Sequence, residues 1–286
     1  EICCALGSAT RLADYEAAVL RAGSALSEGE RRSVFQALTG LSFGLGLLPR
    51  CGFLHFGTTH QLIGSGNDLL SIDRHSSYHE ACLSINNAFG AGGAIRGRNS
   101  WVEGCRIEAA LTLGGENAVI GVDVDEPLAL PARGVVDVLA GRTRSGQDAF
   151  FVRTYASDDV LHKCAGAGGT LAGRPLPEWL TGLGASEADV WGAEIAPAAR
   201  CVWNGRLFPA VAAPGDYRHW LFLLAPETAD DSQRRAWRAA DRYSFAEMLS
   251  HADLAAFHRR RLLHRAAALR QAGLFAFRAE SELSAR

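Results

Sequence analysis

The sequence of residues 95–119 is IRGRNSWVEGCRIEAALTLGGENAV, in which a large apolar side chain recurs at every sixth position. The five positions are Ile95, Trp101, Ile107, Leu113 and Val119. This period fits neither a single helix, at about 3.6 residues per turn, nor a single strand, which alternates about every second residue. It fits a parallel β-helix, in which each short side turns one residue inward and the coils stack. We therefore expect a short parallel, left-handed β-helix over residues 74–160.

Glycines fall between or just after the expected inward positions, where a coil must turn tightly. They are Gly97, Gly104, Gly114 and Gly121. The period ends there, because the next inward position would be Asp125. A glycine-rich antiparallel sheet remains the alternative to the solenoid.

A β-hairpin is expected to close the solenoid. Residues 134–139 and 149–155 are apolar, strand-like runs, and the polar turn between them contains Gly141 and Gly146. Beyond this hairpin the pattern predicts a mostly helical region over residues 161–286.

Two capping boxes mark expected helix starts, Ser27 with Glu30 and Ser244 with Glu247. We expect the second box to begin one long helix that runs to about Arg278. Its apolar stripe, interpreted as a packing surface, comprises Met248, Ala252, Ala255, Leu262, Ala266 and Leu269. A cluster of arginines is expected on a solvated face, with nucleic-acid or phosphate binding as the less favoured alternative. The cluster comprises Arg259, Arg260, Arg261 and Arg265.

The composition excludes several classes of protein. A net charge of −2 over 286 residues, with Lys163 as the only lysine, leaves no electrostatic footprint for nucleic acid. No apolar run is long enough to span a membrane. The seven cysteines are scattered without a C-x-x-C pair, so we expect reduced, mostly buried thiols in a cytoplasmic protein. Because the chain begins at Glu1, we interpret it as part of a longer polypeptide.

Known catalytic loops are not evident in the sequence. Residues 90–93 and 166–170 are glycine-rich but lack the Lys-Ser/Thr of a P-loop, so we interpret both as turns. Residues 181–186 are interpreted as a helix-end connector rather than a kinase loop. An acyltransferase solenoid would need a base, but no histidine occurs over residues 81–160, and only His79 and His162 flank them.

Four segments carry a family resemblance. They are FLHFGTT (residues 53–59), NSWVE (99–103), GENAVIG (115–121) and WNGRLFP (203–209). Together they resemble the L-fucokinase and GDP-L-fucose pyrophosphorylase family, with HFGTT as the most specific piece. The resemblance implies an α+β or mainly β fold with helices. Residues 1–73 would end a nucleotidyltransferase domain, residues 74–160 would form the β-helix, and residues 161–286 would form a mostly helical linker.

The resemblance also implies a function. It is the synthesis of GDP-L-fucose from GTP and L-fucose 1-phosphate, by an enzyme fused to an L-fucokinase. The transferase nucleotide loop would precede Glu1 and the kinase loop would follow Arg286, so the segment alone is expected to be catalytically incomplete. Mg²⁺ is the implied cofactor, with ligands outside this chain, and no catalytic residue is assigned. The alternative is a non-catalytic β-solenoid scaffold or a homo-oligomerisation module.

By resemblance, His55, Gly57, Thr58 and Thr59 are candidates for binding the sugar-phosphate end of the substrate. The alternative is that His55 lies in a buried strand while a hydroxyl of the Gly-Thr-Thr segment caps the next helix.

Asn204 and Arg206 are further substrate-binding candidates with a weaker basis. An Asn-Gly turn followed by a surface arginine is the alternative there.

Overall fold

The computed structural model describes residues 2–6, 10–41, 44, 46–47, 54–72 and 82–271. The chain divides into two compact units, residues 1–53 and residues 54–286. The described residues of the first unit form three helices, α1 (Ile2–Ala5), α2 (Leu12–Arg21) and α3 (Glu28–Leu38). They pack around Tyr15 and Val19. The capping box predicted at Ser27 and Glu30 is present at the start of α3.

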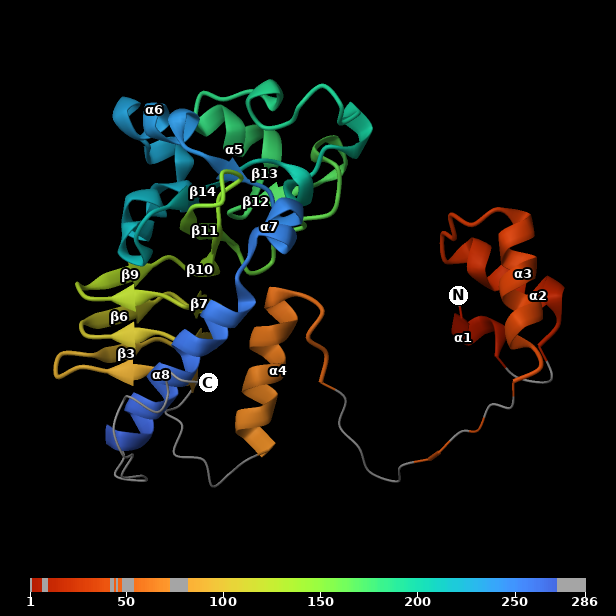
Figure 1. Cartoon of the computed structure of the whole chain (residues 1–286), viewed down its shortest axis with the longest axis horizontal. Coiled ribbons are helices and arrows are strands. Elements are labelled where there is room, and N and C mark those ends of the chain that lie inside the picture. The colour runs from red at the N-terminus through yellow and green to blue at the C-terminus, as the bar shows by residue number, and fades with distance from the viewer. Residues whose placement is uncertain are drawn as a thin grey trace. The chain divides into compact units, whose positions relative to one another are not determined.

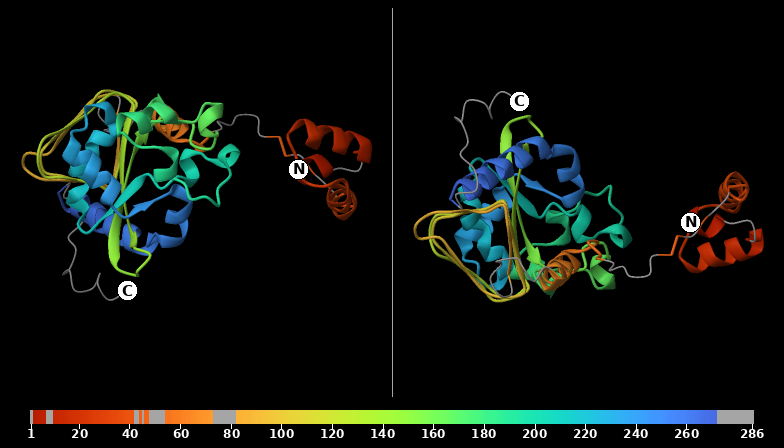
Figure 2. Two further views of the ribbon diagram at one scale, coloured as in Figure 1. Left: turned by 90° about the horizontal axis from the view of Figure 1, so that it is seen from above. Right: turned by 90° about the horizontal axis from the view of Figure 1, so that it is seen from below.

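Nine short strands of the second unit wind into a three-sided parallel solenoid (Figure 1). The first coil is β1 (Cys82–Ile85), β2 (Ala88–Phe89) and β3 (Ala94–Arg96); the second is β4 (Ser100–Glu103), β5 (Arg106–Ile107) and β6 (Ala110–Leu113); the third is β7 (Ala118–Ile120), β8 (Asp123–Val124) and β9 (Leu128–Leu130). Corresponding strands pair in parallel from coil to coil. Figure 2, which looks along the stack, shows the coils superimposed. The predicted parallel solenoid is confirmed, and the antiparallel alternative is wrong for these strands.

One coil takes 16 to 18 residues, whereas a strict period of six on three sides would give 18. Ala94 pairs with Ala110, Val102 with Val119 and Cys82 with Ser100, which are steps of 16, 17 and 18 residues. The register therefore slips against a strict period of six. For this reason the solenoid continues past Asp125, which is exposed, and its interior is filled by Val124 before it and by Leu128 and Leu130 after it.

Four of the five predicted inward residues take part in the solenoid core. Ile107, Leu113 and Val119 are buried there, and Ile95 packs against them. The prediction is wrong for Trp101, because its neighbour Val102 points inward instead. Trp101 faces outward and joins the second hydrophobic core.

Helix α4 (Thr59–Ile72) covers the outer face of β1 and β4. Residues 64–68, which resemble a polar turn, lie inside this helix. Helix α4 accommodates Gly66 because the ring of Trp101 packs directly against it.

The predicted hairpin is confirmed. Strand β10 (Gly134–Arg142) continues the solenoid face parallel to β7 and turns back as β11 (Asp148–Ala156), its antiparallel partner. Strands β14 (Phe208–Val211) and β15 (Arg242–Tyr243) extend this face to a seven-stranded sheet. One face of the sheet closes the solenoid interior, and the other packs on the C-terminal region.

The C-terminal region contains helices, 3₁₀ turns and a small two-stranded sheet in addition to those two strands. The remaining elements are η1 (Ala165–Ala167), β12 (Thr170–Leu171), β13 (Arg174–Pro175), α5 (Leu176–Gly182), η2 (Glu187–Asp189), η3 (Pro197–Ala199), η4 (Val202–Asn204), η5 (Pro214–Leu224), η6 (Pro226–Thr228), α6 (Asp231–Ala239), α7 (Phe245–His251) and α8 (Leu254–Gln271). Their core is built on Trp179 and Trp237, whose rings meet edge to face with centroids 5.8 Å apart. None of the helices in the described ranges is long and apolar enough to cross a bilayer.

The long helix predicted from Ser244 is in fact two helices. Helix α7 begins at the predicted capping box but ends at His251, because Ala252 is extended and forms a β-bridge with Gly141. The carboxylate of Asp253 then accepts a hydrogen bond from a backbone N–H in the first turn of α8. The edge of β10 therefore interrupts the helix. The predicted end at Arg278 lies outside the described residues.

Helix α8 runs down the stack of coils and contacts all three (Figure 1). Arg260 pairs with Asp123 of the third coil at 2.5 Å, and Arg261 pairs with Glu103 at the end of β4. The side chain of Gln271 donates to the carbonyl of Phe89 in the first coil.

The sequence interpretation of α8 therefore needs two corrections. Arg260 and Arg261 lie on the docked face and not on a solvated one, whereas Arg259 and Arg265 are exposed. The expected apolar stripe is not continuous either, because Ala255 and Leu262 are exposed.

The six described cysteines carry free thiols. Cys82, Cys105 and Cys201 are buried, and burial raises the pKa of Cys105 to about 12. Cys3 and Cys4 are exposed, so the expectation of mostly buried thiols holds for half of the described set.

Candidate functional site

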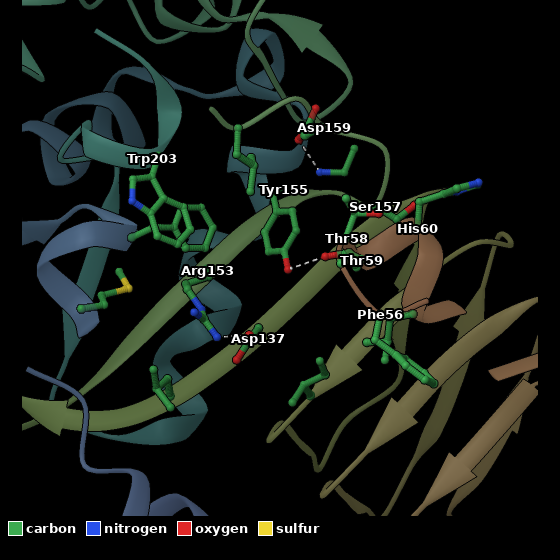
Figure 3. A pocket seen from close by; sticks show the side chains of 18 of the residues that line it. Phe56, Thr58, Thr59, His60, Asp137, Arg153, Tyr155, Ser157, Asp159 and Trp203 are labelled. Carbon is green, nitrogen blue, oxygen red and sulfur yellow. Dashed lines mark hydrogen bonds and ion pairs between the residues drawn. The ribbon is translucent and has the colours of Figure 1, made fainter. Parts of the chain in front are cut away.

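A cleft of about 910 Å³ opens on the outer face of the β10–β11 hairpin (Figure 3). The two strands form its floor. The start of α4 and the loop after β11 form one end, and Trp203 with helices α7 and α8 forms the facing wall. Every lining residue belongs to the second unit.

The centre of the floor is an ion pair between the two strands. Asp137 on β10 lies directly opposite Arg153 on β11, and the guanidinium contacts the carboxylate. Asp137 is only 4% exposed. Burial raises the pKa of Asp137, although the charge of Arg153 acts in the opposite direction. Oδ1 of Asp137 and Nε of Arg153 have no hydrogen-bond partner among the described residues.

Alternate residues of β11 continue this floor towards α4. The hydroxyl of Tyr155 lies 3.1 Å from that of Thr59. Burial, with the charge of Asp137, raises the pKa of Tyr155. Just after the end of β11 is Ser157, which is 3% exposed and whose hydroxyl has no partner among the described residues. Figure 3 shows Ser157 beside Thr58 and His60.

Asp159 holds the loop that carries Ser157. Its carboxylate accepts hydrogen bonds from the backbone N–H groups of Ala156, Ala172 and Gly173, at 2.6, 2.7 and 2.9 Å. Burial raises the pKa of Asp159, while these hydrogen bonds lower it. The loop is therefore tied to both β11 and the β12–β13 turn.

The start of α4 brings three predicted residues into the cleft. Gly57, Thr58 and Thr59 all line it. Thr58 is also the N-cap, because its hydroxyl accepts from the backbone N–H of Gln61 at 3.2 Å. The capping alternative is therefore confirmed for Thr58, which both starts the helix and faces the cleft.

His55 does not line the cleft. It is exposed and lies outside the strands, so a buried strand position is wrong for it. Its ring lies against Gly57, where a Cβ atom would come within 2.7 Å of Cε1 of His55. The Ser65 hydroxyl donates to its carbonyl at 2.7 Å. His55 therefore supports the turn that precedes α4.

Aromatic rings form the wall that faces the floor. Trp203 and Phe245 are stacked, with centroids 5.5 Å apart and planes at 8°. The ring of His162 packs on Trp203 at 4.4 Å. The guanidinium of Arg153 lies 5.5 Å from the centroid of Phe245. The wall thus offers flat apolar surfaces next to the polar floor.

Asn204 has a structural role beside this wall. Its amide oxygen accepts from Nε1 of Trp191 at 2.8 Å and from the N–H of Cys201 at 3.0 Å, and its amide nitrogen donates to the carbonyl of Ala199 at 2.9 Å. These bonds fix the 3₁₀ turn that presents Trp203. Asn204 itself does not line the cleft.

Arg206 also lies elsewhere. It pairs with Glu247 at 2.9 Å and lines a separate cavity of about 320 Å³ together with Arg144 and Arg242. The structure therefore brings together Gly57, Thr58 and Thr59, and it separates them from Asn204 and Arg206.

Sequence reasoning missed the floor and the wall of the cleft. An acidic residue inside the apolar run Val135-Val136-Asp137-Val138-Leu139 was the available signal for Asp137. Trp203 lies within the family segment WNGRLFP, directly before Asn204. Nothing in the local sequence indicates that these two residues share one cleft.

The glycine-rich loops are turns, as predicted. Residues 90–93 form a tight turn between β2 and β3, with the N–H of Gly93 donating to the carbonyl of Gly90 at 3.0 Å. Residues 181–186 end α5, and Gly184 there has a left-handed φ of 62°. His79 lies outside the described residues.

The donor set for a metal is sparse. In the described part of the chain, no three His, Cys, Asp or Glu side chains converge as metal ligands. That the ligands of Mg²⁺ lie outside this chain stays a prediction.

The comparisons with known proteins identify a family. Residues 3–213 match the model of the fucose pyrophosphorylase domain, which is well over half of the chain. No curated protein and no solved structure matches. The chain therefore belongs to the fucose pyrophosphorylase family.

Proposed function

We propose that this chain is a segment of a fucose-1-phosphate guanylyltransferase, which makes GDP-L-fucose from GTP and L-fucose 1-phosphate. In this reaction a phosphate oxygen of the sugar phosphate attacks the α-phosphorus of GTP. The bond to the bridging oxygen of the β-phosphate breaks, and pyrophosphate leaves. The family match over residues 3–213 supports this proposal.

The observation that carries the proposal is the start of α4 in the cleft. The first N–H groups of a helix have no partner within the helix, and the positive end of its dipole favours anions. Thr58, Thr59 and His60 place this end at the cleft, next to Ser157 and the only lysine, Lys163. This end of the cleft suits a phosphate group.

The remaining parts of the proposal concern the whole enzyme. Residues 1–73 would end the nucleotidyltransferase domain, residues 74–160 would be its β-helix, and residues 161–286 would be the linker to an L-fucokinase. The nucleotide loop and the ligands of Mg²⁺ would lie outside this chain. The enzyme would work in the cytoplasm.

The test is an assay of the natural polypeptide that contains these residues. Given GTP, Mg²⁺ and L-fucose 1-phosphate, it should release pyrophosphate and form GDP-L-fucose, both measured by chromatography. The 286-residue chain alone should release little pyrophosphate. Absence of GDP-L-fucose from the natural polypeptide would overturn the proposed function, and robust turnover by the isolated chain would contradict the incompleteness of the segment.

A second candidate function is a scaffold or homo-oligomerisation module. Four leucines of α7 and α8 favour it, because each exposes more than half of its surface. They are Leu249 (75%), Leu254 (59%), Leu262 (55%) and Leu263 (57%). Light scattering across a range of concentrations checks this: a self-association that Leu262→Glu abolishes supports the module, and a monomer at all concentrations rejects it.

A further inference from the structure

We propose that the floor and the aromatic wall of the cleft bind the sugar ring of the sugar phosphate, with Asp137 and Arg153 as its hydroxyl-binding pair. The inference rests on the proposed function, since it assigns the ring of that substrate to one end of the same cleft. The phosphate group occupies the other end, at the start of α4.

The first argument is the presence of buried polar atoms without partners. Oδ1 of Asp137, Nε of Arg153 and the hydroxyl of Ser157 are all inaccessible, and none has a hydrogen-bond partner among the described residues. Leaving such a group unpaired costs about 1–3 kcal/mol. All three belong to residues that line the cleft, so a polar ligand in the cleft can pair them.

The second argument is the size and shape of the cleft. Arg153 and Tyr155 alternate along β11 on one edge of the floor, about 7 Å apart at ~3.4 Å per residue, and Ser157 continues the row in the loop that follows. This row accommodates a pyranose ring and a phosphate in line. The cleft volume of about 910 Å³ is also in the usual range of about 300–1,000 Å³ for small-ligand sites.

The third argument is the distribution of charge. Asp137 and Arg153 neutralise each other, so the floor offers one acceptor and one donor without net charge. A phosphate gains no net electrostatic attraction there, because the carboxylate offsets the guanidinium. The opposite end has the helix N-terminus and Lys163. The ligand is therefore oriented with its neutral ring on the floor and its anion at α4.

A guanine base is the competing occupant of this floor, and the geometry disfavours it. Guanine presents two adjacent N–H donors, which suit both oxygens of a free carboxylate. Oδ2 of Asp137 is already engaged by Arg153, so only Oδ1 lacks a partner among the described residues. A ring hydroxyl needs one acceptor and one donor, which Oδ1 of Asp137 and Nε of Arg153 supply. Trp203, which lines the cleft and is only partly buried, offers an apolar surface to the C–H groups of the ring, and the buried Phe245 supports it from behind by stacking.

The test is calorimetric titration of the full chain with L-fucose 1-phosphate, inorganic phosphate and GDP. Asp137→Asn should weaken binding of L-fucose 1-phosphate at least about tenfold, because a hydrogen bond to a charged group is lost, and should leave binding of inorganic phosphate unchanged. Ser157→Ala should weaken the binding of both L-fucose 1-phosphate and inorganic phosphate. Asp148→Asn is the matched control, since Asp148 forms an exposed ion pair with Arg142 on the same hairpin.

Trp203→Leu serves as a second variant in case Asp137→Asn does not fold, and it should weaken the sugar phosphate but not inorganic phosphate. Unchanged binding of L-fucose 1-phosphate to a folded Asp137→Asn protein overturns the inference. So does a loss that affects GDP instead. If the wild-type chain does not bind L-fucose 1-phosphate although the natural polypeptide makes GDP-L-fucose, the inference fails and the proposed function stands.

Discussion

Gly66 of α4 packs directly on the indole ring of Trp101 in β4. A Cβ atom at Gly66 would lie 2.8 Å from both Cε3 and Cζ3 of Trp101, and 3.0 Å from Cδ2 of Leu83. The helix approaches the outer face of the solenoid this closely only because the residue has no side chain. Since the first turn of the same helix carries Thr58 and Thr59, this contact also positions one end of the cleft.

Gly66→Ala should destabilise the second unit by about 1–3 kcal/mol, because the methyl group overpacks the interface. This outcome would outweigh the gain in helix propensity, which is at most about 1 kcal/mol. Gly64→Ala is the control: Gly64 is exposed in the same helix, and a Cβ atom added there would meet nothing within 4 Å beyond the adjoining residues and the backbone of its own helix, so the change should stabilise. Urea unfolding of both variants measures the difference. Equal stabilisation by the two changes would contradict the packing on Trp101.

Asn117→Ala should disrupt the turns of the solenoid. The side chain is fully buried, and its amide nitrogen donates to the carbonyls of Pro131 and Gly134 at 2.6 and 2.8 Å. Its oxygen accepts from the N–H of Gly115 at 2.8 Å. Each buried polar group left without a partner costs about 1–3 kcal/mol, so the unfolding temperature should fall markedly. Thr112→Ala, an exposed change on β6, should leave the unfolding temperature nearly unchanged.

Glu247 should make the stability of the second unit depend on pH in the acid range. Burial would raise the pKa of Glu247, but the backbone hydrogen bond from Ser244 and the contact with Arg144 outweigh it and lower the pKa below the usual 4.5. A lowered pKa means that Glu247 stabilises the fold above about pH 4.5, and that this contribution is lost as the pH falls through the folded-state value. Between about pH 3 and 6, the free energy of unfolding should therefore change less with pH for Glu247→Gln than for the wild type. Glu178→Gln, at an exposed position of α5, should follow the wild type.

Arg260→Ala should loosen α8 from the third coil. Arg260 pairs with Asp123 at 2.5 Å, and both side chains are less than a quarter exposed. Loss of the guanidinium leaves the largely buried carboxylate of Asp123 with only the longer ion pair to Arg106, at 3.5 Å. Hydrogen exchange should become faster in α8 and β8. Arg259→Ala changes an exposed neighbour and should leave both elements protected; equal effects of the two substitutions would mean that α8 is not held by this pair.

The local features of the fold were predictable from the sequence. The apolar period over residues 95–119 indicated the solenoid, and the strand-like runs after Pro131 indicated the hairpin. The two capping boxes indicated the starts of α3 and α7. Each of these signals is a relationship among residues close together in the chain, which is where turn sterics, side-chain alternation and capping hydrogen bonds act.

The family segments in turn indicated Gly57, Thr58 and Thr59, which do line the cleft. They also indicated Asn204 and Arg206, which do not. Resemblance marks a segment, but it does not say which of its side chains faces a cavity: in WNGRLFP that residue is Trp203.

Tertiary structure alone decided the features that depend on distant segments. Trp101 points outward because α4 offers it a surface, and the helix after Ser244 breaks because Ala252 pairs with the edge of β10. The cleft likewise joins Asp137 and Trp203, which lie far apart in the chain. Sequence periodicity limits which face of a strand or helix a side chain can lie on. Burial and pairing with remote residues then decide between the possible faces, because those contacts exist only once the chain has folded.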